Sequence, residues 1–307
     1  MHHTIAFLTT DDLEDFFVWD NLLIAPFAER GISVETISWH AKDIDWSRFT
    51  AVIVRSTWDY QDDADAFIAT LNTIEKSGTT LLNPLSLMQW NISKHYLQTL
   101  SEQGVEIIPS AFFKQVDSTI IAAHFTYFDS EELIIKPLIS ANSDNTFRLT
   151  KASLLAQSTD LNTIFADTPC VIQPFLNSVI NEGEYSLFYF NGHYSHTIKK
   201  VPKQGDFRVQ EEHGGQLHTV IPEAQLLATA QHVLAQLPES SLYARIDLLR
   251  NHVTCDDLAS TATSHTWQLM EVELIEPSLY FNMDPASPER FVQATIDYLQ
   301  LNDVCHN

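Results

Sequence analysis

Short apolar runs alternate with longer amphipathic segments over the first hundred residues of the chain. The apolar runs at 5–8, 34–37 and 51–54 have the length of strands, and apolar side chains fall at helical spacing within 64–74. Strands that alternate with helices are typical of βαβ units, whose strands form a parallel sheet. The pattern therefore predicts an α/β unit at the N-terminus.

The expected helices of this unit carry residues that interrupt or end a helix. Pro26 lies inside the first helical segment, so this helix is expected to be kinked or to begin late. A further helix is predicted over 86–103, and Gly104 is the residue type that commonly follows a helix end.

The pattern changes after residue 104, where strands become more prominent. Strands are predicted at 132–136 and 170–173, and a polar loop, 140–146, lies between them. This segment reads as a separate packed unit, since no long linker, repeat or low-complexity tract divides the chain.

A β-hairpin is predicted in the last third of the chain. The apolar runs 185–190 and 193–198 are joined by Asn-Gly, which is the strongest short signal for a hairpin. A helix is expected at 223–236, and two acid-bearing strands follow it. Antiparallel strands with an intervening helix predict an α+β unit.

Three carboxylates occupy those last two strands. Glu271 and Glu273 lie two apart in an apolar run, so both project from one face, and Asp247 ends a run that can pair alongside. Buried like charges repel, so such a cluster is stable only when a cation or protons neutralise it. Oxygen ligands favour Mg²⁺. We therefore predict that the three acids converge on a magnesium site; the alternative is a solvated edge strand.

The overall charge restricts the partners of the protein. The chain has 307 residues, of which 40 are acidic and 17 are basic, and its formal net charge is −23. Such a charge repels nucleic acid and anionic membranes, so neither is expected as a partner. Any anionic ligand must instead be met by a local group of basic residues.

Cysteine content and hydropathy predict a reduced, cytoplasmic protein. Cys170, Cys255 and Cys305 have no metal-ligand spacing, and their odd number argues against a disulfide framework. The chain shows neither a secretory signal at its start nor an apolar run of membrane-spanning length.

Four basic residues are candidates for a local phosphate site. Lys136 ends an aliphatic strand before Pro137, although a single lysine there is more often a surface residue. Lys200 follows the hairpin, Arg208 lies just beyond it, and Arg245 shares a predicted strand with one of the acids. Cations beside metal-binding carboxylates are what nucleotide phosphate transfer requires.

Several short motifs follow one another along most of the chain, and no single one of them is specific alone. They are Lys94 on a helix, Ile135-Lys136-Pro137, Val171-Ile172-Gln173-Pro174-Phe175, Glu182-Gly183-Glu184, Lys200 with Asp206-Phe207-Arg208 and Gly214-Gly215, Arg245-Ile246-Asp247 and Glu271-Val272-Glu273. In this order they resemble the ATP-grasp superfamily. The chain is most similar to the branch with prokaryotic glutathione synthetases, ribosomal-protein glutamate ligases and, closest, D-cycloserine-forming cyclo-ligases. This closer similarity rests on Trp39, Ile44-Asp45-Trp46, the run from Arg55 to Tyr60, and Glu276-Pro277-Ser278-Leu279.

The resemblance implies a fold, a set of cofactors and site residues. The fold would comprise an N-terminal α/β substrate domain (1–104), a central lid subdomain (105–177) and a C-terminal subdomain that bears the metal (178–307). The residues that would hold ATP are Lys94, Lys136, Ser140, Gln173, Pro174, Phe175, Leu176 and Glu184. The two lysines would bind the phosphates, the backbone of 173–176 would hydrogen-bond to the adenine, and Glu184 would bind the ribose hydroxyls. Two Mg²⁺ ions would bind Asp247, Glu271 and Glu273, while Lys200, Arg208 and Arg245 would stabilise the transferred phosphoryl group.

The activity that the resemblance implies is ATP-dependent ligation of a carboxylate to an amine through an acyl phosphate. The partners would be small amino-acid-like molecules, and a homo-oligomer is compatible with the family. Two alternatives stay open: a phosphotransferase with a stable phosphorylated product, and a non-catalytic nucleotide-binding module.

The chain departs from the superfamily at two points. The loop over the triphosphate is usually rich in glycine, whereas 140–146 contains none, and Asp144 within it would repel phosphate. Glu273 also stands where many relatives have asparagine, which adds a negative charge to the metal site.

Substrate contacts are predicted at two places. Arg55 follows a strand at the carboxyl edge of the parallel sheet, where it would grip a substrate carboxylate while Thr57 and Asp59 contact the amine. The alternative is an Arg55–Asp59 ion pair that shapes the loop. Ser278 and Tyr280, just past the metal strand, are the other predicted contacts.

Two further groups of residues are weaker candidates. Trp39, Trp46 and Trp58 are able to line a substrate pocket, although tryptophans at element ends more often serve packing. His213 beside Gly214-Gly215 is the best-placed general base, but a surface histidine near a closing loop is the favoured interpretation.

Overall fold

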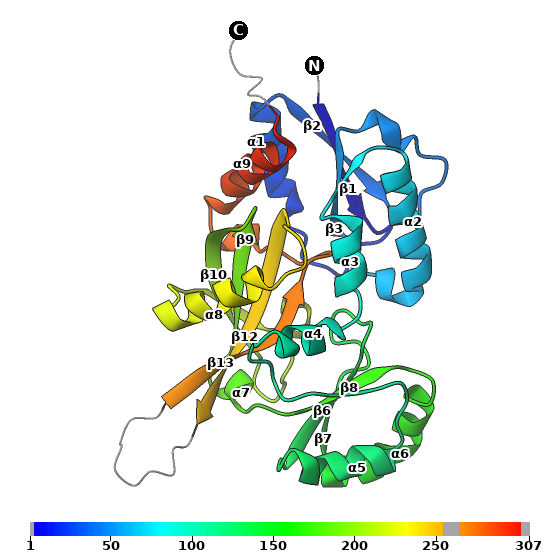
Figure 1. Ribbon diagram of the computed structural model, residues 1–307, viewed down its shortest axis with the longest axis vertical. Helices are drawn as coiled ribbons and strands as arrows, with labels where there is room; N and C mark the ends of the chain where they lie inside the picture. Colours follow the sequence, from blue (N-terminus) through cyan, green and yellow to red (C-terminus); the bar gives the residue numbers. More distant parts are fainter. Residues whose placement is uncertain (1–2, 254–263, 302–307) are drawn as a thin grey trace.

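The computed structural model describes residues 3–253 and 264–301. Its strands form three sheets that follow one another along the long axis of the molecule (Figure 1). The N-terminal sheet lies at the top of this view, the sheet that carries the acids lies in the middle, and the third sheet lies at the bottom.

The N-terminal sheet is parallel, as the alternation of strands and helices predicts. Its strand order is β2 (Ile32–Ser38), β1 (His3–Thr9), β3 (Ala51–Ser56) and β4 (Thr80–Leu82). The predicted helix at 64–74 is α2 (Ala64–Lys76), which buries Phe67, Leu71 and Ile74. Two short 3₁₀ helices, η2 (Trp46–Arg48) and η3 (Tyr60–Asp63), complete the connections.

The first helix begins late, as Pro26 predicts. A 3₁₀ turn, η1 (Asp20–Leu23), precedes α1 (Ile24–Glu29) and places Pro26 in the first turn of the α-helix. In that turn a backbone N–H has no intrahelical partner, so a proline is tolerated.

The single helix predicted over 86–103 is wrong, because the chain forms two helices there, α3 (Leu85–Asn91) and α4 (Tyr96–Glu102). The interruption coincides with hydrogen bonds to other sheets. Asn91 Nδ2 donates to the carbonyl of Val272 at 2.9 Å, and the Lys94 amide donates to the carbonyl of Leu138 at 2.8 Å. These tertiary contacts override the local helical pattern. Gly104 follows α4 with φ +89°, as expected of a residue after a helix end.

The lowest sheet in Figure 1 is antiparallel and is covered by two helices. Its strand order is β5 (Ala111–Phe113), β8 (Cys170–Pro174), β6 (Glu132–Pro137) and β7 (Phe147–Thr150). Helices α5 (Ser118–Tyr127) and α6 (Lys151–Ile164) pack on it through one apolar cluster. Cys170 is a free, buried cysteine, while Cys255 and Cys305 lie outside the described residues.

The middle sheet contains the predicted hairpin and both acid-bearing strands, all antiparallel. Its order is β11 (Gln216–Thr219), β10 (His193–Val201), β9 (Glu184–Phe190), β12 (Tyr243–Val253) and β13 (Ser264–Glu273). The helix predicted at 223–236 is α8 (Ala224–Ala235). The shorter helices of this part are α7 (Ser178–Asn181), η4 (Glu211–His213) and η5 (Phe281–Met283).

The two ends of the described chain share one core. Helix α9 (Ser287–Leu299) returns to pack beside α1 (Figure 1). A single apolar cluster joins Ile5 and Phe7 of β1 to Phe188 of β9 and Phe291 of α9. The middle sheet is therefore held against the N-terminal unit. None of the helices within 3–253 and 264–301 has the length and apolar character needed to cross a bilayer.

Candidate functional site

Most of the predicted site residues line one cavity between the middle and lower sheets. The cavity has a volume of about 210 Å³. It contains all the residues predicted for phosphate, adenine, ribose and metal: Lys94, Lys136, Ser140, Gln173, Pro174, Phe175, Leu176, Glu184, Lys200, Arg208, Arg245, Asp247, Glu271 and Glu273. It also contains Ser278 and Tyr280, but not Arg55, Thr57 or Asp59.

The cavity is nearly balanced in charge, in contrast to the chain as a whole. Its basic side chains are those of Lys94, Lys136, Lys200, Arg208 and Arg245, and its acidic ones are those of Glu184, Glu212, Asp247, Glu271, Glu273 and Glu276. The cavity therefore contains the local set of basic residues that an anionic ligand of this acidic protein needs.

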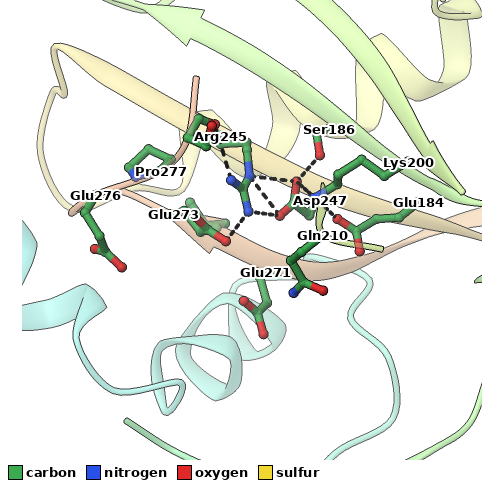
Figure 2. A network of polar contacts seen from close by, with 12 residues as sticks. Glu184, Ser186, Lys200, Gln210, Arg245, Asp247, Glu271, Glu273, Glu276 and Pro277 are labelled. Atoms are coloured by element: carbon green, nitrogen blue, oxygen red, sulfur yellow. Dashed lines mark hydrogen bonds and ion pairs between the residues drawn. The ribbon is translucent and has the colours of Figure 1, made fainter. Parts of the chain in front are cut away.

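The two acid-bearing strands pair as predicted, and their carboxylates are not those of a solvated edge. Asp247 of β12 lies opposite Glu271 of β13, and Arg245 lies opposite Glu273. Asp247 is 1% exposed and accepts a 2.5 Å hydrogen bond from Ser186 Oγ. Figure 2 shows these side chains gathered along the two strands.

The prediction that the three acids converge on one point is wrong. Across 3–253 and 264–301, no group of three or more His, Cys, Asp or Glu side chains is arranged to hold a metal ion. The reason is Arg245, which lies between Asp247 and Glu273 and pairs with both (Figure 2). Glu271 is instead paired with Lys136 across the cavity, with Nζ and Oε1 2.5 Å apart.

The two acids of β13 differ in their electrostatic surroundings. Burial alone raises the pKa of Glu271, but the charges of Lys136 and Lys94 outweigh it and lower this pKa to about 2. Burial raises the pKa of Glu273 to about 7; Arg245 opposes the shift, while Asp247 and Glu271 add to it. Glu271 is therefore held in its ionised form, whereas Glu273 takes up a proton more readily.

Lys200 and Glu184 form a buried ion pair beside Asp247. Lys200 is 2% exposed, its ammonium pairs with Glu184, and its Nζ lies 3.7 Å from Asp247 Oδ1. Burial lowers the pKa of Lys200, but the carboxylates of Asp247 and Glu184 outweigh this effect and raise it. Lys200 is therefore held as a cation inside the protein.

The glycine-free loop adopts the backbone that glycines usually provide. Asn142, Ser143 and Asn145 have φ values of +52°, +62° and +48°, in the left-handed region. Lys94 Nζ donates to the carbonyl of Ser140 at 2.8 Å and thereby joins α3–α4 to the loop. Asp144 accepts a 3.4 Å hydrogen bond from Gln61 of the N-terminal unit and does not line the cavity. The expected repulsion of phosphate by Asp144 is thus relieved by its orientation.

A second loop meets this one over the cavity. Gln210 Nε2 donates to Ser143 Oγ at 2.9 Å, and His213 Nε2 lies 3.4 Å from the carbonyl of Asn142. Arg208, on the same loop, lines the cavity while its guanidinium pairs with Asp206 at 2.8 Å. His213 thus contacts the loop and lies outside the cavity lining.

The three predicted substrate residues of the N-terminal unit lie outside the cavity lining, and two of them, Arg55 and Asp59, are held in other contacts. Arg55 is 1% exposed and pairs with Asp20, with Nη2 and Oδ1 2.8 Å apart, so the alternative Arg55–Asp59 pair is not formed. Asp59 accepts hydrogen bonds from Trp39 Nε1 and Thr10 and pairs with His40. Thr57 is fully buried.

The chain that follows β13 is fixed by side chains from several elements. Its six consecutive carbonyls from 274 to 279 each accept a hydrogen bond from a different side chain. The donors, in order, are Asn83, Tyr243, Trp58, Arg55, Arg245 and His196, at 2.7, 2.8, 2.8, 3.1, 3.3 and 3.2 Å. The segment that carries Glu276, Ser278 and Tyr280 is therefore a rigid wall of the cavity.

Sequence reasoning missed three of the residues that line the cavity and gave little weight to a fourth. Phe16, Tyr60 and Glu276 line the cavity and were not among the expected site residues, and Trp58 was only a weak candidate. Trp39 and Trp46 pack in the core of the N-terminal unit. Glu276 carried a signal, because it belongs to the motif shared with the cyclo-ligases, but its side chain had no assigned task.

Comparisons with known proteins agree with this geometry. Residues 5–83 match the family described as D-cycloserine synthetase DcsG, N-terminal domain, and residues 105–263 match the family described as Prokaryotic glutathione synthetase, ATP-grasp domain. The chain is 28% identical over 285 residues to the cycloserine biosynthesis protein DcsG of Streptomyces lavendulae, which covers 88% of this chain and 90% of that protein.

Solved structures extend the similarity to the whole fold. The crystal structure of D-cycloserine synthetase DcsG superimposes with a TM-score of 0.81 and 25% identity, covering 96% of this chain and 99% of that one. D-alanine–D-alanine ligase from Bacillus anthracis superimposes with a TM-score of 0.63 and 14% identity, covering 97% of each chain. The second likeness concerns the fold alone.

Proposed function

Because this chain belongs to the ATP-grasp family of the prokaryotic glutathione synthetases, a family of ligases that form C–N bonds, we propose that it ligates a carboxylate to an amine through an acyl phosphate. The substrate is small and amino-acid-like. The observation that carries this proposal is the cavity in which five basic side chains and the carboxylates of β12 and β13 come together.

ATP is the cofactor of the family, and the cavity residues fit it. Lys94 and Lys136 reach the cavity from two different units, at places where ammonium groups can neutralise phosphate oxygens. The left-handed backbone at Asn142 and Ser143 turns the 140–146 loop along the cavity. We assign the phosphates to these groups, the adenine to the 173–176 backbone and the ribose to Glu184.

The carboxylates also fit Mg²⁺. In proteins this ion usually binds one or two carboxylates together with substrate phosphates, so three converging acids are not required. Asp247 lies opposite Glu271 on neighbouring strands, and Glu273 projects from the same end of β13. We assign two Mg²⁺ ions to Asp247, Glu271 and Glu273; bound there, they would neutralise charge on the triphosphate.

The basic residues of the middle sheet are placed for the chemical step. A substrate carboxylate attacks the γ-phosphate, ADP leaves, and the amine then displaces phosphate from the acyl phosphate. Lys200 and Arg245 are buried cations, and each is held by hydrogen bonds or ion pairs. Preorganised cations of this kind stabilise developing charge without reorganising. We propose that they do so here, with Arg208 as the third cation.

The same assignment gives each of the three units of the chain a separate role. We propose that residues 1–104 form the substrate domain, that 105–177 form the lid, and that 178–307 carry the metal. The match of residues 5–83 to the N-terminal domain of D-cycloserine synthetase supports a substrate related to that of the cyclo-ligase, either for ring closure or for amide formation.

A phosphate-release screen tests this function. The protein, ATP and Mg²⁺ are combined with pairs of amino acids and amines, and products are identified by mass. An amide or a ring with stoichiometric ADP and phosphate is the expected result. A stable phosphorylated product would instead identify a phosphotransferase, and no ADP with any pair would identify a nucleotide-binding module.

A further inference from the structure

One end of the cavity combines aromatic rings with a carboxylate. The rings of Phe16 and Trp58 lie with their centroids 5.1 Å apart and their planes tilted by 48°, and Trp58 Nε1 donates to the carbonyl of Glu276 at 2.8 Å. Tyr60, the first residue of η3, lines the cavity with them. We call these four residues, Phe16, Trp58, Tyr60 and Glu276, the aromatic–carboxylate end.

Glu276 differs from the other carboxylates around it. Glu271 pairs with Lys136, while Asp247 and Glu273 pair with Arg245. In contrast, no side chain in the described part of the chain donates a hydrogen bond to the Glu276 carboxylate or forms an ion pair with it. Figure 2 shows it apart from the Arg245 network, with no dashed line to any of the residues drawn. Burial raises the pKa of Glu276 to about 8, and the charge of Glu273 adds to this shift while that of Lys94 opposes it, so a cationic ligand beside Glu276 would stabilise its ionised form.

The backbone that carries this carboxylate is fixed by side chains of other elements. Trp58 holds the carbonyl of residue 276 itself, and Arg55 and Tyr243 hold those of residues 277 and 275. A group that is fixed before binding loses little conformational freedom when it binds. Glu276 therefore extends from a backbone that is already ordered before a ligand binds.

The chemistry of this end selects a small organic cation. Aromatic faces attract an ammonium through their quadrupoles, and a carboxylate adds a charge-assisted hydrogen bond. A phosphate or a second carboxylate would instead be repelled by Glu276. The group predicted to hold the substrate amine, Asp59, is already occupied by Trp39 and His40.

We propose that the aromatic–carboxylate end binds the ammonium group of an amino-acid substrate, with Glu276 as the residue that selects it over the corresponding hydroxy acid. This inference deepens the proposed ligase function and rests on it. The ammonium that Glu276 holds stays protonated, so it serves recognition. The nitrogen that attacks the acyl phosphate is a different one.

The test uses hydroxylamine as a common nucleophile, so that the natural amine need not be known. Hydroxamate formation with ATP and Mg²⁺ is measured for alanine against lactate and for serine against glycerate, in both enantiomers. The variants are Glu276→Gln, Glu276→Asp and, as a matched control, Glu131→Gln, whose carboxylate is exposed and does not line the cavity.

The wild type is expected to prefer the amino acid. Glu276→Gln should raise KM for it by about 10- to 100-fold, the size of a lost charge-assisted hydrogen bond, with a smaller change in kcat. Glu276→Asp should recover part of the preference, and Glu131→Gln should match the wild type. Equal use of amino and hydroxy acids by the wild type, or an undiminished preference in Glu276→Gln, would overturn the proposal.

A binding measurement separates this proposal from the ligase function. Tryptophan fluorescence is followed during titration with ethylammonium chloride, with ethanol and sodium chloride as controls, and Trp58→Phe identifies the signal. A saturable change that the ammonium alone causes, and that Glu276→Gln loses, supports the site even if no hydroxamate forms and the ligase function fails. The absence of such a change in the wild type would reject the site.

Discussion

Arg55 and Asp20 form a buried ion pair that supports the wall of the cavity. Two guanidinium nitrogens of Arg55, Nε and Nη2, donate to Asp20 Oδ1 at 3.0 and 2.8 Å, and Nη2 also donates to the carbonyl of Pro277 at 3.1 Å. Arg55, which was predicted to bind the substrate, instead holds the backbone between Glu276 and Ser278.

Removal of Asp20 should destabilise the protein strongly. Asp20→Ala leaves the Arg55 charge buried without its partner, which typically costs about 3 to 5 kcal/mol. Chemical denaturation measures this loss. The surface pair of Arg48 and Glu35 provides the control, because Arg48→Ala should leave the free energy of unfolding nearly unchanged. Equal effects of the two substitutions would contradict the structural role of Arg55.

His196 should make stability depend on pH. Burial is the main reason that its pKa falls from 6.5 to about 4; Asp284 opposes the shift and Arg290 adds to it. The unfolded chain binds a proton near pH 6.5, whereas the folded protein does so only near pH 4. The free energy of unfolding should therefore decrease as the pH falls through this window, by up to about 3 kcal/mol.

His196→Gln isolates this contribution. Glutamine can still donate to the carbonyl of Leu279, as His196 Nε2 does at 3.2 Å, but it does not titrate. Denaturation series between pH 7 and pH 4 should give a shallower decrease for the variant than for the wild type. Parallel curves would show that His196 does not titrate as described.

The glycine-free loop should tolerate glycine and resist β-branched residues. Asn145 is exposed with φ +48°, where a β-branched side chain costs about 1 to 2 kcal/mol more than glycine or asparagine. Asn145→Val should raise KM for ATP by roughly 5- to 20-fold, while Asn145→Gly should stay within about 2-fold of the wild type. Steady-state kinetics measure both, and equal values for both variants would show that the loop changes conformation to bind ATP.

Glu271→Gln should abolish activity while the protein stays folded. The substitution removes a predicted metal ligand but keeps an oxygen that can accept from Lys136, whose Nζ lies 2.5 Å from Glu271 Oε1. Substrate-dependent ADP release should fall by about 100-fold or more, as expected for a lost metal ligand. Circular dichroism checks the fold. Near-normal turnover would reject the metal role of Glu271.

The regular elements were predictable because their signals are local. The apolar runs of β1 and β3 and the Asn-Gly turn between β9 and β10 are patterns of neighbouring residues. These elements formed as predicted. The prediction of one helix over 86–103 was wrong because Asn91 forms a hydrogen bond to β13. Its partner there lies about 180 residues away in the sequence, so no local pattern reveals it.

The composition of the site was more predictable than its geometry. Motif order led to the residues that line the cavity, but it did not reveal that Arg245 lies between Asp247 and Glu273. The partner of Arg55 was also missed, since Asp20 lies in a 3₁₀ turn without any motif. Side-chain pairing depends on how the sheets dock, and that information is not local.

The most direct test of the account is a crystal structure with magnesium and a non-hydrolysable ATP analogue. The triphosphate is expected between Lys94 and Lys136 on one side and the β12–β13 carboxylates on the other, with magnesium bound by Asp247, Glu271 and Glu273. An analogue bound elsewhere, or magnesium without contact to any of these carboxylates, would contradict it.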